Sequence, residues 1–137
     1  DPSRRELAIG PHGFVPEDPQ TVRLKFVGVI EGEHARKAIA ESEKATGGKP
    51  FVILCETHGM KNVTPDARKV FADGFGKAPL AAVAMIGSNI RTRAIATFVI
   101  TAINVFRTTK LNVAFFDDEP EARQWVAEEL KGWSGTP

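Results

Sequence analysis

The chain has 137 residues, the size of one ordinary domain, and its 42% hydrophobic and 26% charged residues exclude a disordered protein. Its 18 lysines and arginines against 17 acidic residues give a net charge of +1, so no uniform positive field argues for a general nucleic-acid or membrane-surface binder. The single cysteine, Cys55, excludes an internal disulfide and a zinc cluster of thiolates.

Extended segments open the chain. Residues 6–15 are interrupted by a Gly-Pro-His-Gly sequence, and the apolar–polar alternation that begins residues 22–29 predicts a half-exposed strand near a sheet edge. Residues 33–46 predict a helix with a thin apolar face, which a Gly-Gly pair ends. Residues 51–55 are a continuous apolar run, which is typical of a central strand covered on both faces.

Two further helix–strand units and a last helix follow. Thr64, with a proline and an aspartate after it, predicts the start of a helix in which the threonine is the N-cap. Residues 80–86 predict a buried strand, and residues 88–106 a long helix capped by the serine at its start. Residues 111–116 predict the last strand, and a sequence that resembles a capping box begins a final helix over residues 118–132.

The predicted order is therefore β-β-α-β-α-β-α-β-α in a single domain of residues 1–137. This alternation indicates an α/β domain with a mixed sheet of about five strands and four helices on its faces. The most apolar stretch, residues 94–106, is shorter than the roughly 20 residues that cross a bilayer. The first residues carry no apolar run of a signal peptide, so we expect a cytoplasmic protein without membrane insertion.

Several local sequences match a known family in order and spacing. They are the Gly28 strand end, the Phe51-Val52-Ile53-Leu54 run, the Gly87-Ser88 pair with Arg91 and Arg93, and the Phe115-Phe116-Asp117 strand end before the last helix. In these features, from about Glu6 to Leu130, the chain resembles the STAS domain of sulphate transporters and anti-sigma-factor antagonists. Within it, the chain is similar to the small uncharacterised bacterial proteins of the STAS-like superfamily. The resemblance implies a STAS-like fold and a regulatory protein–protein interaction.

The resemblance also points to one residue. In anti-sigma-factor antagonists, an Asp-Ser-Ser-Gly motif after the third strand carries a serine that is phosphorylated at the helix start. The matching stretch here is residues 63–66, in which Thr64 falls on a hydroxyl position, whereas Val63 replaces the leading aspartate and Asp66 replaces the glycine. Thr64 is therefore a candidate phosphosite, although as an N-cap its hydroxyl serves the helix without any modification.

The start of the long predicted helix carries Arg91 and Arg93, and no acidic residue accompanies them in that helix. Positive side chains in a first helical turn oppose the helix dipole, so a bound anion relieves the arrangement. Alternatively, both arginines reach solvent or pair with Glu56 or Asp66. Because the C-terminal ends of parallel strands gather at one sheet edge, we expect an anion- or partner-binding site there. Its candidate residues lie in the loop 57–64 and the helix start 88–93: Thr57, His58, Thr64, Ser88, Arg91 and Arg93.

The predicted helix 89–106 is apolar on more than one side. Such a helix buries more than one sheet contact, so we expect it either to form a homodimer interface or to line a pocket for an apolar ligand. The candidate residues of this face are Ile95, Phe98, Val99, Ala102 and Phe106.

Catalytic and cofactor motifs are weak. Cys55 and His58 are three residues apart, but a cysteine that ends an apolar strand is typical of a small core residue. His12, His34 and His58 show no metal-ligand spacing, and the glycines match neither a phosphate loop nor a dinucleotide motif. We therefore expect no catalytic residues, no metal and no cofactor.

Charge is divided along the chain, because residues 61–110 carry eight basic and two acidic residues, whereas residues 111–137 carry two and six. Without a repeated basic–aromatic pattern, we expect no nucleic-acid binding. The sequence predicts a non-enzymatic binding module that presents the segments 57–64 and 88–93 to a protein partner or a small anion. The alternative is a lipid or apolar-ligand carrier that uses the helix 89–106.

Overall fold

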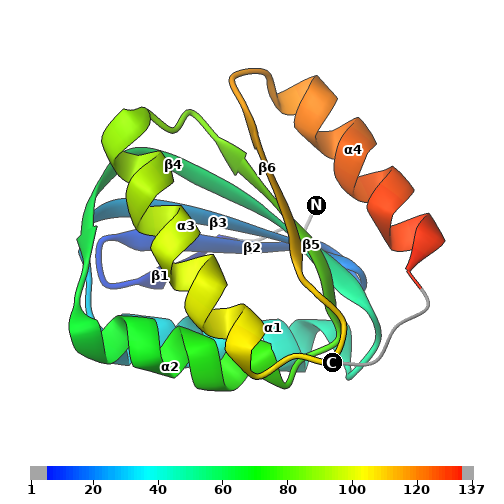
Figure 1. Ribbon diagram of the computed structural model, residues 1–137, viewed down its shortest axis with the longest axis horizontal. Helices are drawn as coiled ribbons and strands as arrows, with labels where there is room; N and C mark the ends of the chain where they lie inside the picture. The colour runs from blue at the N-terminus through cyan, green and yellow to red at the C-terminus, as the bar shows by residue number, and fades with distance from the viewer. Residues whose placement is uncertain (1–5, 134–137) are drawn as a thin grey trace.

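The computed structural model describes residues 6–133, which form one mixed sheet flanked by four helices (Figure 1). The strands are β1 (Leu7–Ile9), β2 (His12–Asp18), β3 (Thr21–Ile30), β4 (Phe51–Val63), β5 (Leu80–Ile86) and β6 (Asn112–Phe116). The helices are α1 (Gly32–Thr46), α2 (Pro65–Gly76), α3 (Ile90–Val105) and α4 (Glu119–Gly132).

The six strands lie in the sheet in sequence order, from β1 at one edge to β6 at the other. The β1–β2 and β2–β3 pairs are antiparallel, and the three pairs from β3 to β6 are parallel. Because each parallel strand is added on the same side of the previous one, right-handed crossovers place α1, α2 and α3 on one face of the sheet. The last helix, α4, covers the other face over β4 and β5 (Figure 1).

Each face of the sheet has its own apolar core. Beneath α1, α2 and α3 the core is aromatic, since the Phe26 and Phe71 ring centroids lie 6.2 Å apart and the Phe71 ring stacks on Phe75 at 5.8 Å. Beneath α4 the core includes small residues such as Ala82 and Ala122, which have no exposed surface, and the Phe116 and Trp125 rings pack beside it, 5.7 Å apart. Small residues let α4 approach the sheet closely, whereas the aromatic core holds α3 farther from it.

The predicted α/β architecture with four helices is confirmed, with two corrections in the strands. The first extended segment is a hairpin, because Gly10, at φ 59°, turns the chain between β1 and β2. The sheet therefore has six strands rather than about five. The prediction of a loop over residues 57–64 is wrong, because β4 continues to Val63. Met60 and Val63 are buried and pair with β3, so they extend the core along the strand.

Candidate functional site

Thr57 and Ser88, two residues of the predicted anion site, are buried against each other. The Thr57 Oγ1 atom lies 2.6 Å from Ser88 Oγ and 3.4 Å from the carbonyl oxygen of Ile86. The pair therefore joins β4 to the segment that leads into α3. The prediction that Ser88 caps the long helix is wrong: with the serine engaged by Thr57, the cap is Asn89, whose Oδ1 accepts a hydrogen bond from the Thr92 N–H at 2.9 Å.

The His58 imidazole lies directly over Gly87, at the end of β5. Gly87 has a φ of 78°, and a Cβ atom added to it would lie 2.3 Å from the imidazole. Only glycine fits both the backbone conformation and the close approach. His58 is exposed, whereas Cys55 faces the core, where burial raises the pKa of its thiol to about 12. The two residues therefore do not form a nucleophile and base.

The two arginines in the first turn of α3 are exposed. The Arg93 guanidinium lies over the Phe115 ring, 5.1 Å from its centroid. The two carboxylates considered as partners are paired with other arginines. Glu56 is paired with Arg23 of β3 at 2.8 Å, and Asp66 is paired with Arg36 of α1 at 3.2 Å. Neither carboxylate neutralises Arg91 or Arg93, so the start of α3 keeps its excess of positive charge.

Thr64 lies apart from the other residues of the predicted site. Its Oγ1 accepts a hydrogen bond from the Ala67 N–H at 3.1 Å, so it is the N-cap of α2 as predicted. Between Thr57 and Thr64 the chain is extended in β4, which separates the two residues by roughly 20 Å. The six predicted residues therefore divide into a buried pair, an exposed corner that holds His58 and the arginines, and a remote helix cap.

The outer side of α3 is apolar and exposed. Four large side chains of α3 and its C-cap are more than half exposed: Ile90 (90%), Phe98 (61%), Val105 (74%) and Phe106 (54%). Between them is a shallow hollow lined by small side chains of α3, Ala94, Thr97, Thr101 and Ala102. These eight residues are called the α3 surface below.

The fold divides the face that the sequence predicts for a dimer or an apolar ligand. Phe98 and Phe106 are exposed and Ala102 is half-buried, so these three residues belong to the α3 surface. Ile95 and Val99 instead pack into the core beneath the helix, where both line a small apolar cavity, so of the two predicted roles only the apolar-ligand role is compatible with their position. Sequence reasoning did not separate the two sides, because apolar residues surround most of this helix.

Arginines rim the α3 surface. The Arg68 guanidinium, from α2, lies over the Phe98 ring, 5.0 Å from its centroid. Arg91 and Arg93 stand at the N-terminal end of the helix, and α3 carries no acidic residue. The rim is therefore positive around an apolar centre, a combination that suits ligands with both anionic and apolar parts.

Two small apolar cavities lie between α3 and the sheet, with volumes of about 60 Å³ and 50 Å³. They share lining residues from α2, α3 and three strands: Phe26, Cys55, Phe71, Met85 and Val99. An apolar cavity of about 150 Å³ is needed to hold one benzene molecule. In this conformation the space beneath α3 is therefore too small for a lipid chain.

On the other face of the sheet, charged residues of β2, β3, β4 and α4 form an ion-pair network: Glu17, Arg23, Glu56, Glu119 and Arg123. Arg123 donates to both carboxylate oxygens of Glu17 at 2.7 Å. The hydrogen bond to Glu17 raises the pKa of Arg123, and the hydrogen bond from Arg123 lowers the pKa of Glu119. The paired residues are up to 106 positions apart, so no local sequence pattern signals this network.

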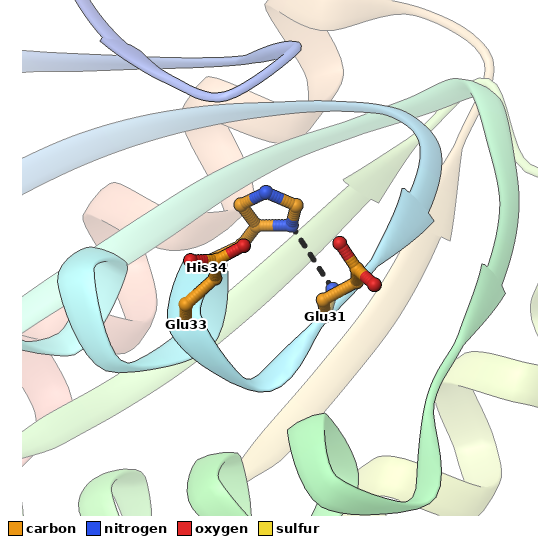
Figure 2. A group of neighbouring side chains, drawn as sticks. All are labelled: Glu31, Glu33 and His34. Carbon is orange, nitrogen blue, oxygen red and sulfur yellow. Dashed lines mark hydrogen bonds between the residues drawn. The ribbon is translucent and has the colours of Figure 1, made fainter.

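Glu31, Glu33 and His34, at the start of α1, place possible metal-ligand atoms within 4.8 Å of one another. Figure 2 shows the imidazole with a carboxylate on either side of it. The His34 Nδ1 atom accepts a hydrogen bond from the Glu31 N–H at 3.0 Å, so this nitrogen already serves the helix start (Figure 2). The two carboxylates are exposed, and the hydrogen bonds among these residues are those of the capping box of α1, so the cluster is accounted for by the start of the helix.

His12, which the sequence does not mark as special, is buried at 2% exposure beside this helix start. Its Nδ1 accepts a hydrogen bond from the Val27 N–H at 3.0 Å, and its ring centroid lies 4.7 Å from that of His34. Burial, and then the nearby His34, lower the pKa of His12 from its ordinary value. The neutral His12 imidazole is the form whose Nδ1 atom can accept the hydrogen bond from the Val27 N–H of β3.

Within residues 6–133, no helix is long and apolar enough to cross a membrane. Such a helix needs about 20 apolar residues, and α3, the most apolar helix, falls short of that length.

Comparisons with known proteins place the chain in a family. No curated protein matches it. Among solved structures, it is similar to an uncharacterised protein of the DUF3478 family with a SpoIIAA-like fold, from Shewanella loihica PV-4. The two share 20% identity over 77% of this chain and 83% of that chain, with a TM-score of 0.58, which confirms the predicted STAS-like fold. The model of a domain of unknown function, DUF7793, matches residues 21–129, and the chain therefore belongs to the DUF7793 family.

Proposed function

We propose that this protein is a non-enzymatic binding module that holds an anionic partner on the α3 surface. The observation that carries the proposal is the exposure of four large apolar side chains on a helix without acidic residues. The solvent side of a helix packed on a sheet normally carries polar and charged residues. A contiguous apolar patch with a charged rim is typical of an interaction site.

The energetics favour an anionic partner. Burial of one Val, Ile or Phe side chain contributes about 1.5–3 kcal/mol, so Ile90, Phe98 and Val105 together supply at most about 5–9 kcal/mol. Association costs about 4–15 kcal/mol in lost translational and rotational freedom. Apolar contact alone is therefore marginal. Arg91 and Arg93 supply the remainder through charge-assisted bonds to carboxylate or phosphate groups.

Two further features support a non-enzymatic role. The Cys55 thiol is buried in the core with its pKa raised to about 12, so it stays protonated near neutral pH. The Thr57 and Ser88 hydroxyls bond each other, and neither is exposed to a substrate. The nucleophiles of the predicted site therefore serve the structure.

Photo-crosslinking tests the proposal. A benzoylphenylalanine replaces Thr97, in the middle of the α3 surface, and in a matched control it replaces Gln124, an exposed residue of α4. In the native cells, we expect an adduct of the full chain, with a protein or with lipid, from position 97 and none from position 124. Absence of an adduct from position 97, or the same adducts from both positions, refutes the proposal.

A second candidate function, a carrier of apolar ligands, is favoured by the cavities beneath α3, whose exposed lining is entirely apolar. Their combined volume is far below the roughly 300 Å³ of ordinary ligand pockets, so a carrier has to move α3 away from the sheet. Native mass spectrometry of protein purified without detergent tests this function. A stoichiometric lipid mass supports the carrier, whereas a bare chain that stays bare after incubation with extracted lipids rejects it.

A further inference from the structure

We infer that the α3 surface binds the surface of an anionic lipid bilayer, peripherally, with α3 parallel to the membrane plane. The inference rests on the proposed function, because it names the partner of the same surface. It invokes no helix that crosses the bilayer.

The exposed apolar side chains extend over the whole length of α3. Ile90 begins the helix, Phe98 lies near its middle, and Val105 ends it, over a length of roughly 24 Å. Residues 90, 94, 97, 101 and 105 recur at intervals of three and four, so they share the outward side of the helix. Helices with such a side lie in the membrane interface with their apolar residues among the headgroups.

Arginine side chains lie beside this apolar line at its start and near its middle. Arg91 and Arg93 are exposed on its two flanks, and Arg68 lies over the ring of Phe98. Other exposed lysines of the same part of the chain are Lys61, Lys69, Lys77 and Lys110. One of the two acidic residues between positions 61 and 110, Asp66, is paired with an arginine of α1. Anionic lipid headgroups attract each basic residue that comes near the membrane surface.

The acidic residues of α4 lie on the far side of the sheet, whereas α1 and α2, beside α3, carry acidic and basic residues together. Residues 111–137 carry six acidic and two basic residues, and α4, which holds most of the described ones, covers the face opposite to α3 (Figure 1). This charge separation turns the α3 surface toward an anionic membrane and keeps the α4 side in solution.

Charge and shape decide between a bilayer and other partners. When the α3 surfaces of two copies face each other, they bring two arginine rims together, and this like-charge contact opposes a homodimer. A protein partner needs a groove shaped to fit a single convex helix. A fluid bilayer adapts to the helix without such a groove, and it offers anionic groups along the whole length of α3.

Vesicle flotation tests the inference with the full chain. We expect binding to vesicles of phosphatidylcholine with phosphatidylserine at about 0.15 M salt, weaker binding at higher salt, and no binding to pure phosphatidylcholine vesicles. The double variant Arg91→Gln with Arg93→Gln weakens binding by about 25-fold, at about fivefold for each charge. The double variant Ile90→Ser with Phe98→Ser weakens it by at least about tenfold.

A matched control removes two lysines of α1, Lys37→Gln with Lys44→Gln, which changes the net charge equally while it leaves the α3 surface intact. Circular dichroism and urea unfolding confirm that each variant folds. Binding kept by the control and lost in both α3 variants supports the inference. Absence of binding to the anionic vesicles, or equal losses in the control, overturns it. If a protein adduct still forms from position 97 in that case, the binding module stands and only the lipid partner is rejected.

Discussion

Arg107 is a buried arginine that donates to four backbone carbonyl oxygens, and its replacement tests what these bonds contribute to the fold. It follows α3 and is 9% exposed. Its guanidinium donates hydrogen bonds to the carbonyl oxygens of Phe75 and Ala78 at 2.9 and 3.1 Å, of Leu80 at 2.6 Å, and of Thr109 at 2.9 Å. One side chain therefore joins the end of α2, the start of β5 and the segment between α3 and β6.

The expected cost follows from these bonds. Burial lowers the pKa of Arg107 from its ordinary value, yet a guanidinium remains charged near neutral pH. A hydrogen bond to a charged group contributes about 1.5–3 kcal/mol, and an unsatisfied buried carbonyl costs about 1–3 kcal/mol. Arg107→Met also removes the cost of keeping a charge away from water, which offsets part of the loss of stability. We therefore expect Arg107→Met to lower the free energy of unfolding by about 3–5 kcal/mol, a large part of the about 5–15 kcal/mol of an ordinary domain.

Urea unfolding followed by circular dichroism measures this loss. Arg107→Lys should lie between the wild type and Arg107→Met, because one ammonium cannot reach all the carbonyls that the planar guanidinium spans. The control Arg91→Met, at an exposed arginine, should change the free energy by less than about 0.5 kcal/mol. A loss below about 1 kcal/mol for Arg107→Met, or wild-type stability of Arg107→Lys, would refute the view that the guanidinium of Arg107 holds α2, β5 and the segment between α3 and β6 together.

Three further predictions concern single residues. Because folding lowers the pKa of His12, the unfolded chain takes up the proton first as the pH falls, and the free energy of unfolding should drop below about pH 6.5. The variant His12→Asn keeps an acceptor for the Val27 N–H, so its urea midpoint should differ less between about pH 7.5 and 5.5 than that of the wild type. An unchanged difference would contradict the assignment of the pH dependence to His12. Gly87→Ala should lower the free energy of unfolding by about 2 kcal/mol or more, since φ is 78° and the new Cβ atom meets the His58 imidazole. In thermal unfolding, the same substitution in a His58→Ala background should cause a smaller loss. A mild loss that His58→Ala does not reduce argues against the clash. Thr64→Ala should cost about 1 kcal/mol in urea unfolding because it removes the N-cap of α2, and a neutral effect would show that the cap is dispensable.

Local patterns predicted the elements of this fold and their order. The apolar runs of β4 and β5, the alternation of β3 and the cap at Thr64 depend on residues close together in sequence, so they can be recognised without the fold. The mixed sheet follows from the order of the elements and the right-handed crossovers. The second half of β4 was missed, because its polar residues pair with β3 at a distance of about thirty positions.

The candidate site was predicted in part. The excess positive charge at the start of α3 is visible in the sequence, but the burial of Thr57 against Ser88 and the remoteness of Thr64 depend on how far β4 extends. The sequence marked α3 as important without deciding which side faces outward. The polar Thr92 is 3% exposed while the apolar Ile90 is 90% exposed, so the polarity of these two side chains points to the wrong side of the helix.

The sequence by itself determined which segments become strands and helices, because hydrophobic period, caps and glycine turns act over a few neighbouring residues. Only the tertiary structure decided which side of α3 meets solvent, which carbonyls Arg107 bonds and which charges α4 shares with the sheet. These contacts join positions far apart in the chain, and their geometry is set by the packing of whole elements. The α3 surface, on which both proposals rest, exists because a helix with apolar residues on several sides cannot bury all of them against the sheet and α2.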